Sequence, residues 1–320
     1  MPAPSAALLA ATRRGDRAAL ARLLSVVEAG GDDARAALTD LPVTAADGSW
    51  TVGITGAPGA GKSTLTNHLV SHLRDAHARV AVLAIDPSSP FTGGAILGDR
   101  VRMQRHDTDP DVFIRSMATR GHLGGLSRAA PQAVRVLAAA GYAWVVVETV
   151  GVGQVEVEIA GAADTTVVVV NPGWGDGIQA AKAGLLEIGD VFVVNKADRD
   201  GVHATVHDLR SMLELAGHRE WDPPIVETVA TEDRGTGELL EALRAHRDHL
   251  ERSGELAQRR EQRIADELRA LVLDRLARQA DDACTGERFA TVVRQVADGS
   301  SDPYTAATLL TEGADLGGES

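Results

Sequence analysis

The sequence predicts an α/β fold in which a mostly parallel sheet is flanked by helices. From Trp50 onward, short β-branched runs alternate with amphipathic segments. The β-branched runs are almost continuously apolar, which is typical of strands that are covered on both faces. A glycine-rich stretch at residues 56–63 joins the first run to a helical segment. The chain is therefore expected to begin its sheet with a strand, a tight loop and a helix.

Composition limits the classes of protein to consider. At 320 residues the chain can bury a large core. Aromatic residues make up only 3%, so the core is expected to be aliphatic. The net charge of −13 argues against a nucleic-acid surface, which needs a basic stripe. The single cysteine, Cys284, excludes an internal disulfide and a Cys-x-x-Cys metal site, and we interpret it as a small buried hydrophobe.

The chain carries no sign of a membrane or secretory segment. Arg13, Arg14 and Asp16 interrupt the Leu/Ala-rich N-terminus, so it lacks the apolar core of a signal peptide. No run reaches the roughly 18 apolar residues of a membrane span. We therefore expect a soluble, cytoplasmic protein.

The helical segments lie at the two ends of the chain. Apolar residues recur at helical spacing over 4–29, and a short helix is expected over 32–38. Charged helices are expected over 238–250 and 255–280. The apolar stripe of 255–280 can pack on a partner subunit or on its own domain. Strands are expected at 50–55, 79–85, 111–115, 143–148, 165–170, 190–194 and 225–228.

The loop after the first strand matches the phosphate-binding pattern G-x-x-x-x-G-K-[ST]. In such a loop backbone N–H groups and the helix N-terminus bind phosphate oxygens. Lys62 reaches the β- and γ-phosphates, and the Ser63 hydroxyl binds Mg²⁺. The predicted nucleotide-binding residues here are Gly56, Ala57, Pro58, Gly59, Ala60, Gly61, Lys62, Ser63 and Thr64.

Acidic residues close two of the later strands, at the edge where parallel sheets collect their working residues. Asp86 follows the second strand; it suits either a metal-linked loop or a solvated position before a proline turn. Glu148 ends the fourth strand, where a phosphate-loop protein carries an acid linked to Mg²⁺. An ordinary capping glutamate is the alternative.

Two further loops follow buried strands. Residues 171–179 contain three glycines and Trp174, and form either a mobile functional element or a long turn. Asn195 and Asp198 lie after the next strand, where an amide and a carboxylate can read a purine edge. The carboxylate accepts from N1–H and the exocyclic amine of guanine, and adenine would leave it unpaired. This pair predicts guanine specificity.

Several segments together resemble one family. They are residues 56–63, Asp-Pro-Ser-Ser-Pro at 86–90 with its continuation to Arg100, Glu-Thr-Val-Gly-Val-Gly-Gln at 148–154, Asn-Lys-Ala-Asp at 195–198, and Pro-Tyr-Thr-Ala-Ala at 303–307. The chain is similar over nearly its whole length to the methylmalonyl-CoA mutase-associated GTPases, the MeaB/ArgK group of P-loop GTPases.

The resemblance implies a function and partners. It implies a homodimeric GTPase that binds GTP, GDP and Mg²⁺ and acts as a chaperone of an adenosylcobalamin-dependent acyl-CoA mutase. The chaperone gates cofactor delivery and protects or reactivates the mutase; a cobalamin adenosyltransferase is a further implied partner. The expected organisation is an N-terminal helical extension over 1–45, a P-loop GTPase domain over 46–250, and a C-terminal helical dimerisation arm and tail over 251–320.

The resemblance also implies site residues. The metal would be surrounded by Ser63, Asp86, Asp99 and Glu148, and an additional switch would lie at 173–182, with Asp176, Gln179 and Lys182. Lys196 and Ala230 join the base-binding residues. Ala230 stands in Thr-Val-Ala-Thr, where many guanine-nucleotide proteins have Ser-Ala and use a backbone N–H.

Catalysis is expected to consist of positioning and charge neutralisation around the γ-phosphate. The candidate residues are Lys62, Glu148 and Gln154, and hydrolysis is expected to be slow until the mutase orders the loops. The alternatives are a metal-delivery accessory GTPase, a protein kinase as the older transport-kinase name suggests, or a scaffold in which GTP is only structural. One cysteine and scattered histidines offer no ligand cluster for metal delivery.

Overall fold

The structure is a computed structural model that describes residues 4–39, 41, 48–87, 104–106, 108–119, 125–149, 161–173, 179–215, 217 and 220–312. Its strands are β1 Trp50–Gly56, β2 Val80–Pro87, β3 Val112–Thr119, β4 Trp144–Thr149, β5 Thr165–Val170, β6 Val191–Asn195 and β7 Ile225–Thr228. Its α-helices are α1 Pro4–Arg13, α2 Arg17–Ala29, α3 Gly31–Thr39, α4 Lys62–Asp75, α6 Gly125–Ala139, α8 Gln179–Ile188, α9 Val202–Leu215, α10 Thr236–Ser253, α11 Glu255–Ala283, α12 Gly286–Ala297 and α13 Pro303–Glu312.

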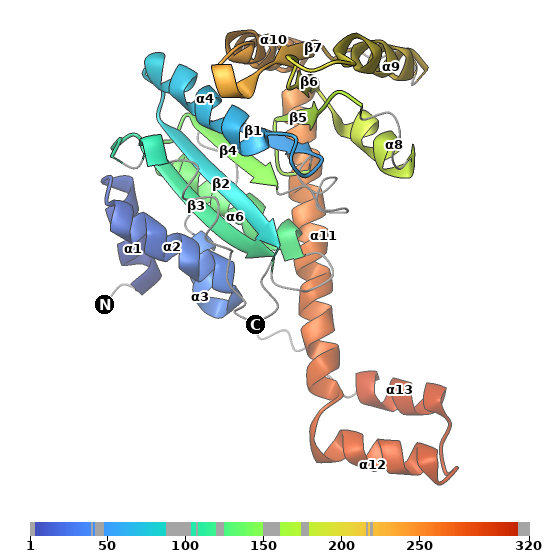
Figure 1. Cartoon of the computed structure of the whole chain (residues 1–320). Coiled ribbons are helices and arrows are strands. Elements are labelled where there is room, and N and C mark those ends of the chain that lie inside the picture. Colours follow the sequence, from blue (N-terminus) through green and yellow to red (C-terminus); the bar gives the residue numbers. More distant parts are fainter. Residues whose placement is uncertain are drawn as a thin grey trace. The chain divides into compact units, whose positions relative to one another are not determined.

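The strands form one seven-stranded sheet in the order β3-β2-β4-β1-β5-β6-β7 (Figure 1). Every neighbouring pair is parallel. This confirms the predicted α/β class. The strands expected from the sequence are all present, and only β3 runs well past its expected end, to Thr119.

Helices cover both faces of the sheet, as the apolar strands require. On one face α4 and α10 pack against alternate residues of β1, β4, β5 and β6. On the other face α2 and α6 cover β2, β3 and β4, while α8 and α9 cover β5 and β6. Most of the buried side chains are Val, Leu, Ile and Ala, in agreement with the low aromatic content.

The terminal helices differ in part from the expectation. The segment 4–29 is two helices, because Gly15 adopts φ +90° and the Asp16 side chain caps α2 by accepting from Ala18 N and Ala19 N. The sequence did not predict α12. Beyond it the turn residues are followed by α13, where Asp302 accepts from Tyr304 N and Thr305 N.

An arginine of β3 adds polar contacts to the apolar packing of the N-terminal helices on the sheet. Arg115 of β3 donates to Ala21 O at 2.9 Å and to Glu28 Oε2 at 2.8 Å, both on α2. The ion pair is largely shielded from water, which strengthens it relative to a surface pair.

Two aspartates bind the amino ends of neighbouring strands in the same way. Asp164 precedes β5 and accepts from Thr51 N of β1 at 3.0 Å; Asp190 precedes β6 and accepts from Thr166 N of β5 at 2.8 Å. Each carboxylate also pairs with at least one arginine of α11. Arg260 and Arg263 pair with Asp164, and Arg259 donates to Asp190 at 3.0 Å.

These arginines affect the two carboxylates differently. Burial alone would raise the pKa of Asp164, but Arg263 and Arg260 outweigh it and lower that pKa below its usual value. At Asp190 burial dominates, and it raises the pKa in spite of Arg259. Asp164 also pairs with two arginines of α11, whereas Asp190 pairs with one.

A buried histidine joins this edge of the sheet to α10. Trp50 Nε1 donates to Thr165 Oγ1 at 3.0 Å, and that oxygen lies 2.9 Å from His246 Nδ1. Burial lowers the pKa of His246 to about 3, with Arg259 contributing. His246 is therefore neutral at physiological pH, and it packs against the Trp221 ring at a centroid distance of 4.9 Å.

The chain divides into two compact units, Met1–Arg263 and Ile264–Ser320. The second unit contains the rest of α11 together with α12 and α13, and none of the α11 or α12 residues is buried. Cys284 is exposed, so its interpretation as a buried hydrophobe is wrong. It follows α11 directly, a helix none of whose residues is buried. Within the described ranges no helix is long and apolar enough to span a membrane.

Candidate nucleotide-binding site

The carboxyl ends of the strands bring the predicted motifs to one edge of the sheet. β1 leads into the loop 56–61, β4 ends at Thr149, β6 ends at Asn195 and β7 ends at Thr228. The register pairs Asn195 with Thr228 directly, although they lie 33 positions apart in the chain. Residues distant in sequence therefore meet at a single site.

Two glycines of the phosphate loop are required by close approaches. Gly56 has φ +134°, and a Cβ there would lie 2.0 Å from Val169 O. Gly61 has φ +92°, and its Cβ would lie 2.3 Å from Asn195 Nδ2. Both backbone conformations also disfavour a side chain. The second contact shows that the loop and the base motif are packed directly together.

Lys62 lies inside the loop that it follows. Its Nζ donates to Gly56 O at 2.7 Å and to Ala57 O at 2.9 Å, and only 5% of the residue is exposed. These carbonyls hold the ammonium group at the mouth of the loop. An ammonium in this place can be shared with phosphate oxygens, which is the role that the motif predicts.

Ser63 and Glu148, two of the predicted metal-binding residues, are in direct contact. Ser63 Oγ donates to Glu148 Oε1 at 2.5 Å, and both residues are buried. Behind them Thr149 Oγ1 bonds to Thr55 Oγ1 at 3.2 Å, linking β4 to β1. A hydroxyl and a carboxylate supply the oxygen donors that Mg²⁺ prefers, so these residues fit that ion.

Asn195 connects the phosphate loop to the segment after β7. Its Nδ2 donates to Ala60 O at 2.7 Å. Its Oδ1 accepts from Thr228 Oγ1 at 3.0 Å and from Ala230 N at 3.1 Å. One N–H of the amide remains for a ligand, so Asn195 can offer a base a donor and not an acceptor. Ala230 N, predicted to bind the base, here bonds to Asn195.

Lys196 and Asp198, the other two predicted base-binding residues after β6, differ in their surroundings. Lys196 adopts φ +60° and donates from Nζ to Gly59 O at 2.7 Å, so it supports the phosphate loop. Asp198 is exposed at the end of this turn. Its carboxylate is accessible to a ligand, as the guanine prediction requires.

Other predicted residues lie wholly or partly outside the described residues. The backbone of Asp86 is described in β2, where its neighbour Ile85 pairs with Thr149, so it reaches the same edge as Glu148. The backbone of α8 includes two predicted switch residues. The side chains of Asp86, Gln179 and Lys182, and all of Asp99, Gln154, Trp174 and Asp176, fall outside the described part.

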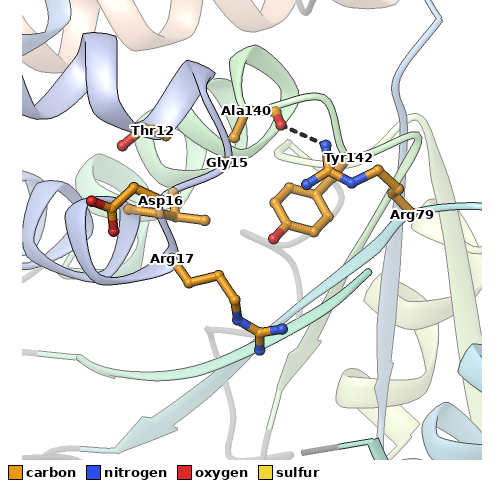
Figure 2. A pocket seen from close by; sticks show the side chains of 8 residues that line it. Thr12, Gly15, Asp16, Arg17, Arg79, Ala140 and Tyr142 are labelled. Carbon is orange, nitrogen blue, oxygen red and sulfur yellow. Dashed lines mark hydrogen bonds between the residues drawn. The ribbon is translucent and has the colours of Figure 1, made fainter. Parts of the chain in front are cut away.

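A small pocket lies elsewhere, beside the turn between α1 and α2 (Figure 2). Arg79 donates to Ala140 O at 2.9 Å, and its guanidinium lies 4.6 Å from the centre of the Tyr142 ring. Burial raises the pKa of Tyr142 although Arg79 opposes the shift. The lining contains no residue of the nucleotide motifs, so this pocket belongs to the packing of the N-terminal helices.

Sequence reasoning missed side chains that organise the site. Thr228 holds Asn195, and Asp233 pairs with His68 and His72 of α4. Neither group of residues has a spacing in the sequence from which its contacts could be predicted. Over the described residues no group of three or more His, Cys, Asp or Glu side chains is arranged to hold a metal ion.

Comparisons with known proteins agree with the geometry. Residues 20–285 match the family model described as methylmalonyl Co-A mutase-associated GTPase MeaB. The chain is 48% identical to a candidate GTPase of Pyrococcus abyssi, covering 95% of this chain and 94% of the relative. It is 40% identical to GTPase ArgK of Escherichia coli, covering 80% of each chain. A crystal structure of a LAO/AO transport system kinase superposes with a TM-score of 0.68 at 29% identity, covering 96% of both chains.

Proposed function

The chain belongs to the MeaB family of methylmalonyl-CoA mutase-associated GTPases, and we propose that it is the chaperone of an adenosylcobalamin-dependent acyl-CoA mutase. As a member of this family it binds guanine nucleotide and hydrolyses GTP. The family match over residues 20–285 carries the proposal, because it extends beyond the nucleotide site from α2 to the end of α11. In this function the nucleotide gates cofactor delivery and protection of the mutase.

The proposed mechanism uses Mg²⁺ together with residues of the phosphate loop. Ser63 and Glu148 would hold the ion, with Asp86 and Asp99 completing its surroundings. The ion neutralises charge on the phosphates when bound. Lys62 neutralises charge on the transferring group, and the backbone N–H groups of the loop orient it. Gln154 is the proposed water-positioning residue.

Guanine selection is proposed to rest on two residues of the base motif. Asp198 is exposed and would accept from N1–H and the exocyclic amine of guanine. Asn195 would donate its remaining amide N–H to the base. The closely packed contact between Asn195 and the phosphate loop supports this arrangement, because it keeps both ends of the nucleotide site together.

The mutase partnership is tested by measuring GTP hydrolysis with and without a purified adenosylcobalamin-dependent acyl-CoA mutase from the same source. We expect slow hydrolysis alone and faster hydrolysis with the mutase, because the partner would order the loops. The Asn195→Ala variant is expected to lose this response. A rate that is the same with and without the mutase would contradict the proposal and leave the GTPase assignment intact.

We further propose that the chain forms a homodimer through its C-terminal arm. Large aliphatic side chains on α11 are between 37% and 61% exposed, namely Ile264, Leu268, Leu271, Val272, Leu273 and Leu276. So much exposed apolar surface on one helix is typical of an interface. Light scattering is expected to give twice the chain mass, and Leu268→Glu is expected to give the monomer. A monomeric parent protein would refute the dimer.

A further inference from the structure

The segment after β7 forms a closed loop beside the site. We call residues 229–234 the base loop. Val229 N donates to Arg234 O at 2.9 Å and Arg234 N donates to Val229 O at 3.3 Å, so the two ends are bonded together. Between them Ala230–Glu232 forms a 3₁₀ turn. Since Ala230 N bonds to Asn195 Oδ1, the placement of this loop contributes to the orientation of the Asn195 amide, together with Thr228 and Ala60.

Asp233 holds the base loop against the helix of the phosphate loop. His72 Nε2 lies 3.1 Å from each oxygen of the Asp233 carboxylate. His68 Nδ1, one turn earlier on α4, lies 3.4 Å from Oδ1. Because α4 begins at Lys62 and Ser63, the base loop is fixed to the same helix that carries the phosphate-binding side chains.

The backbone and charge of Asp233 fit an anchoring role. Its φ is +54°, a left-handed conformation that costs most residues energy and that aspartate tolerates better than most. Burial alone would raise the pKa of Asp233, but the neighbouring Thr236 and His72 side chains, in that order, lower it below the usual value. The group is therefore a carboxylate acceptor at neutral pH.

We propose that Asp233 is a positioning residue for base recognition, which acts through His72 and the base loop to hold the Asn195 amide in the orientation that a guanine base needs. Asp233 does not itself have to touch the nucleotide. The base loop carries Ala230, Ala230 fixes one lone pair of Asn195 Oδ1, and Asn195 presents its remaining N–H to the ligand. Loss of the anchor loosens the base end of the site and leaves the phosphate end in place.

The test measures, in the variants Asp233→Gly and His72→Ala, how tightly the protein binds the base end and the phosphate end of the nucleotide. Glycine tolerates the left-handed backbone but makes the loop more flexible. His72→Ala leaves the loop sequence unchanged, so a loss shared by both variants is assigned to the contact between Asp233 and His72. GDP binding is measured with a fluorescent GDP analogue, and the phosphate end is measured separately by competition with inorganic pyrophosphate. GDP is expected to bind about tenfold more weakly, which corresponds to about 1.4 kcal/mol. Pyrophosphate competition is expected to stay unchanged.

Two comparisons make the test specific. Glu241→Ala removes an exposed carboxylate from α10, and it is expected to bind GDP as the parent protein does. The double variant is expected to bind GDP no more weakly than Asp233→Gly alone, because Asp233→Gly already removes the contact with His72. If both single variants remain folded and bind GDP normally, the proposal is wrong. It is also wrong if GDP and pyrophosphate weaken in proportion, because the anchor would then support the phosphate loop.

Discussion

The two ends of the parallel sheet both contain buried polar groups, but they use them differently. At the carboxyl end, Ser63 contacts Glu148, and Asn195 joins the phosphate loop to the base loop while keeping one N–H for a ligand. At the amino end, Asp164 and Asp190 are bonded on one side to strand N–H groups and on the other to arginines of α11. The first end can exchange partners with a nucleotide, whereas the second holds the strands and α11 together.

This difference predicts that substitutions at one end change function and substitutions at the other change stability. The strongest test is Asp164→Ala, which leaves Arg260 and Arg263 without their common carboxylate. Breaking a buried ion pair is expected to lower the free energy of unfolding by about 3 kcal/mol. GTP hydrolysis by the folded protein should not change. Urea unfolding and a phosphate-release assay measure the two quantities.

A matched exposed pair provides the control for that experiment. Arg247 and Glu251 lie one helical turn apart on α10 with Nε and Oε1 2.8 Å apart, and Glu251 is well exposed. Glu251→Ala is expected to change the free energy of unfolding by no more than about 0.5 kcal/mol. Equal losses in the two variants would contradict the structural role given to the amino end.

At the carboxyl end the largest effect is expected for Lys62→Ala. Removing the ammonium group from the γ-phosphate is expected to slow GTP hydrolysis about 100-fold, or about 2.7 kcal/mol of transition-state stabilisation. Stability should change little, because the loop carbonyls that accept from Lys62 can bind water once the side chain is gone. If the Lys62→Ala variant hydrolysed GTP at the rate of the parent protein, the catalytic role proposed for Lys62 would be wrong.

The pH dependence of stability tests His246 at the amino end. Burial lowers its pKa to about 3, whereas an unfolded histidine titrates near 6.5. The unfolded chain therefore binds more protons between these values, and stability falls as the pH is lowered from about 6.5 towards 3. At pH 5 this costs about 2 kcal/mol relative to pH 7.

His246→Gln is expected to remove that part of the pH dependence. The raised pKa of Asp190 acts in the opposite direction, and it is present in both proteins. The comparison is made by urea unfolding at pH 7 and pH 5, with His203→Gln, an exposed position on α9, as control. If the parent and His246→Gln lose equal stability at pH 5, the assignment of a neutral buried histidine is wrong.

The smallest effects are expected from two Thr→Val substitutions, one at each end of the sheet. Thr228→Val removes the hydroxyl that bonds Asn195, and Thr165→Val removes the hydroxyl between Trp50 and His246. Each is expected to cost about 1 kcal/mol. In Thr228→Val the loss should appear mainly as weaker GDP binding, and in Thr165→Val as lower stability with normal GDP binding. A reversed pattern would overturn the division between the two ends.

The sequence predicted the carboxyl end better than the amino end for a physical reason. Phosphate and base recognition require particular residue types at fixed spacings, so Lys62, Ser63, Asn195 and Asp198 could be identified within short motifs. Strand positions followed from apolar runs that need burial on both faces. The predicted division into 1–45, 46–250 and 251–320 stays a prediction beside the two compact units.

The polar residues at the amino end of the sheet do not lie at fixed spacings within short motifs. Asp164 and Arg260 are 96 residues apart, and His246 lies 81 residues from Thr165. Only one local signal was present: an aspartate stands immediately before both β5 and β6, at the position where its carboxylate can bind the next strand's backbone. The partners on α10 and α11 depend on how the chain returns to the sheet, which periodicity does not specify.

The hydrogen bonds that run from Trp50 to His246 give the protein an internal magnetic-resonance reporter. An indole N–H can only donate, so Thr165 Oγ1 accepts from Trp50, and the same oxygen lies within hydrogen-bond distance of His246 Nδ1. The neutral ring carries one proton, so one of its two nitrogens is protonated and the other is not. Its two nitrogen resonances should stay far apart from neutral pH down to the low pKa of His246. Trp50 opens the strand that ends at Gly56, so this signal follows the amino end of the nucleotide strand from within the core.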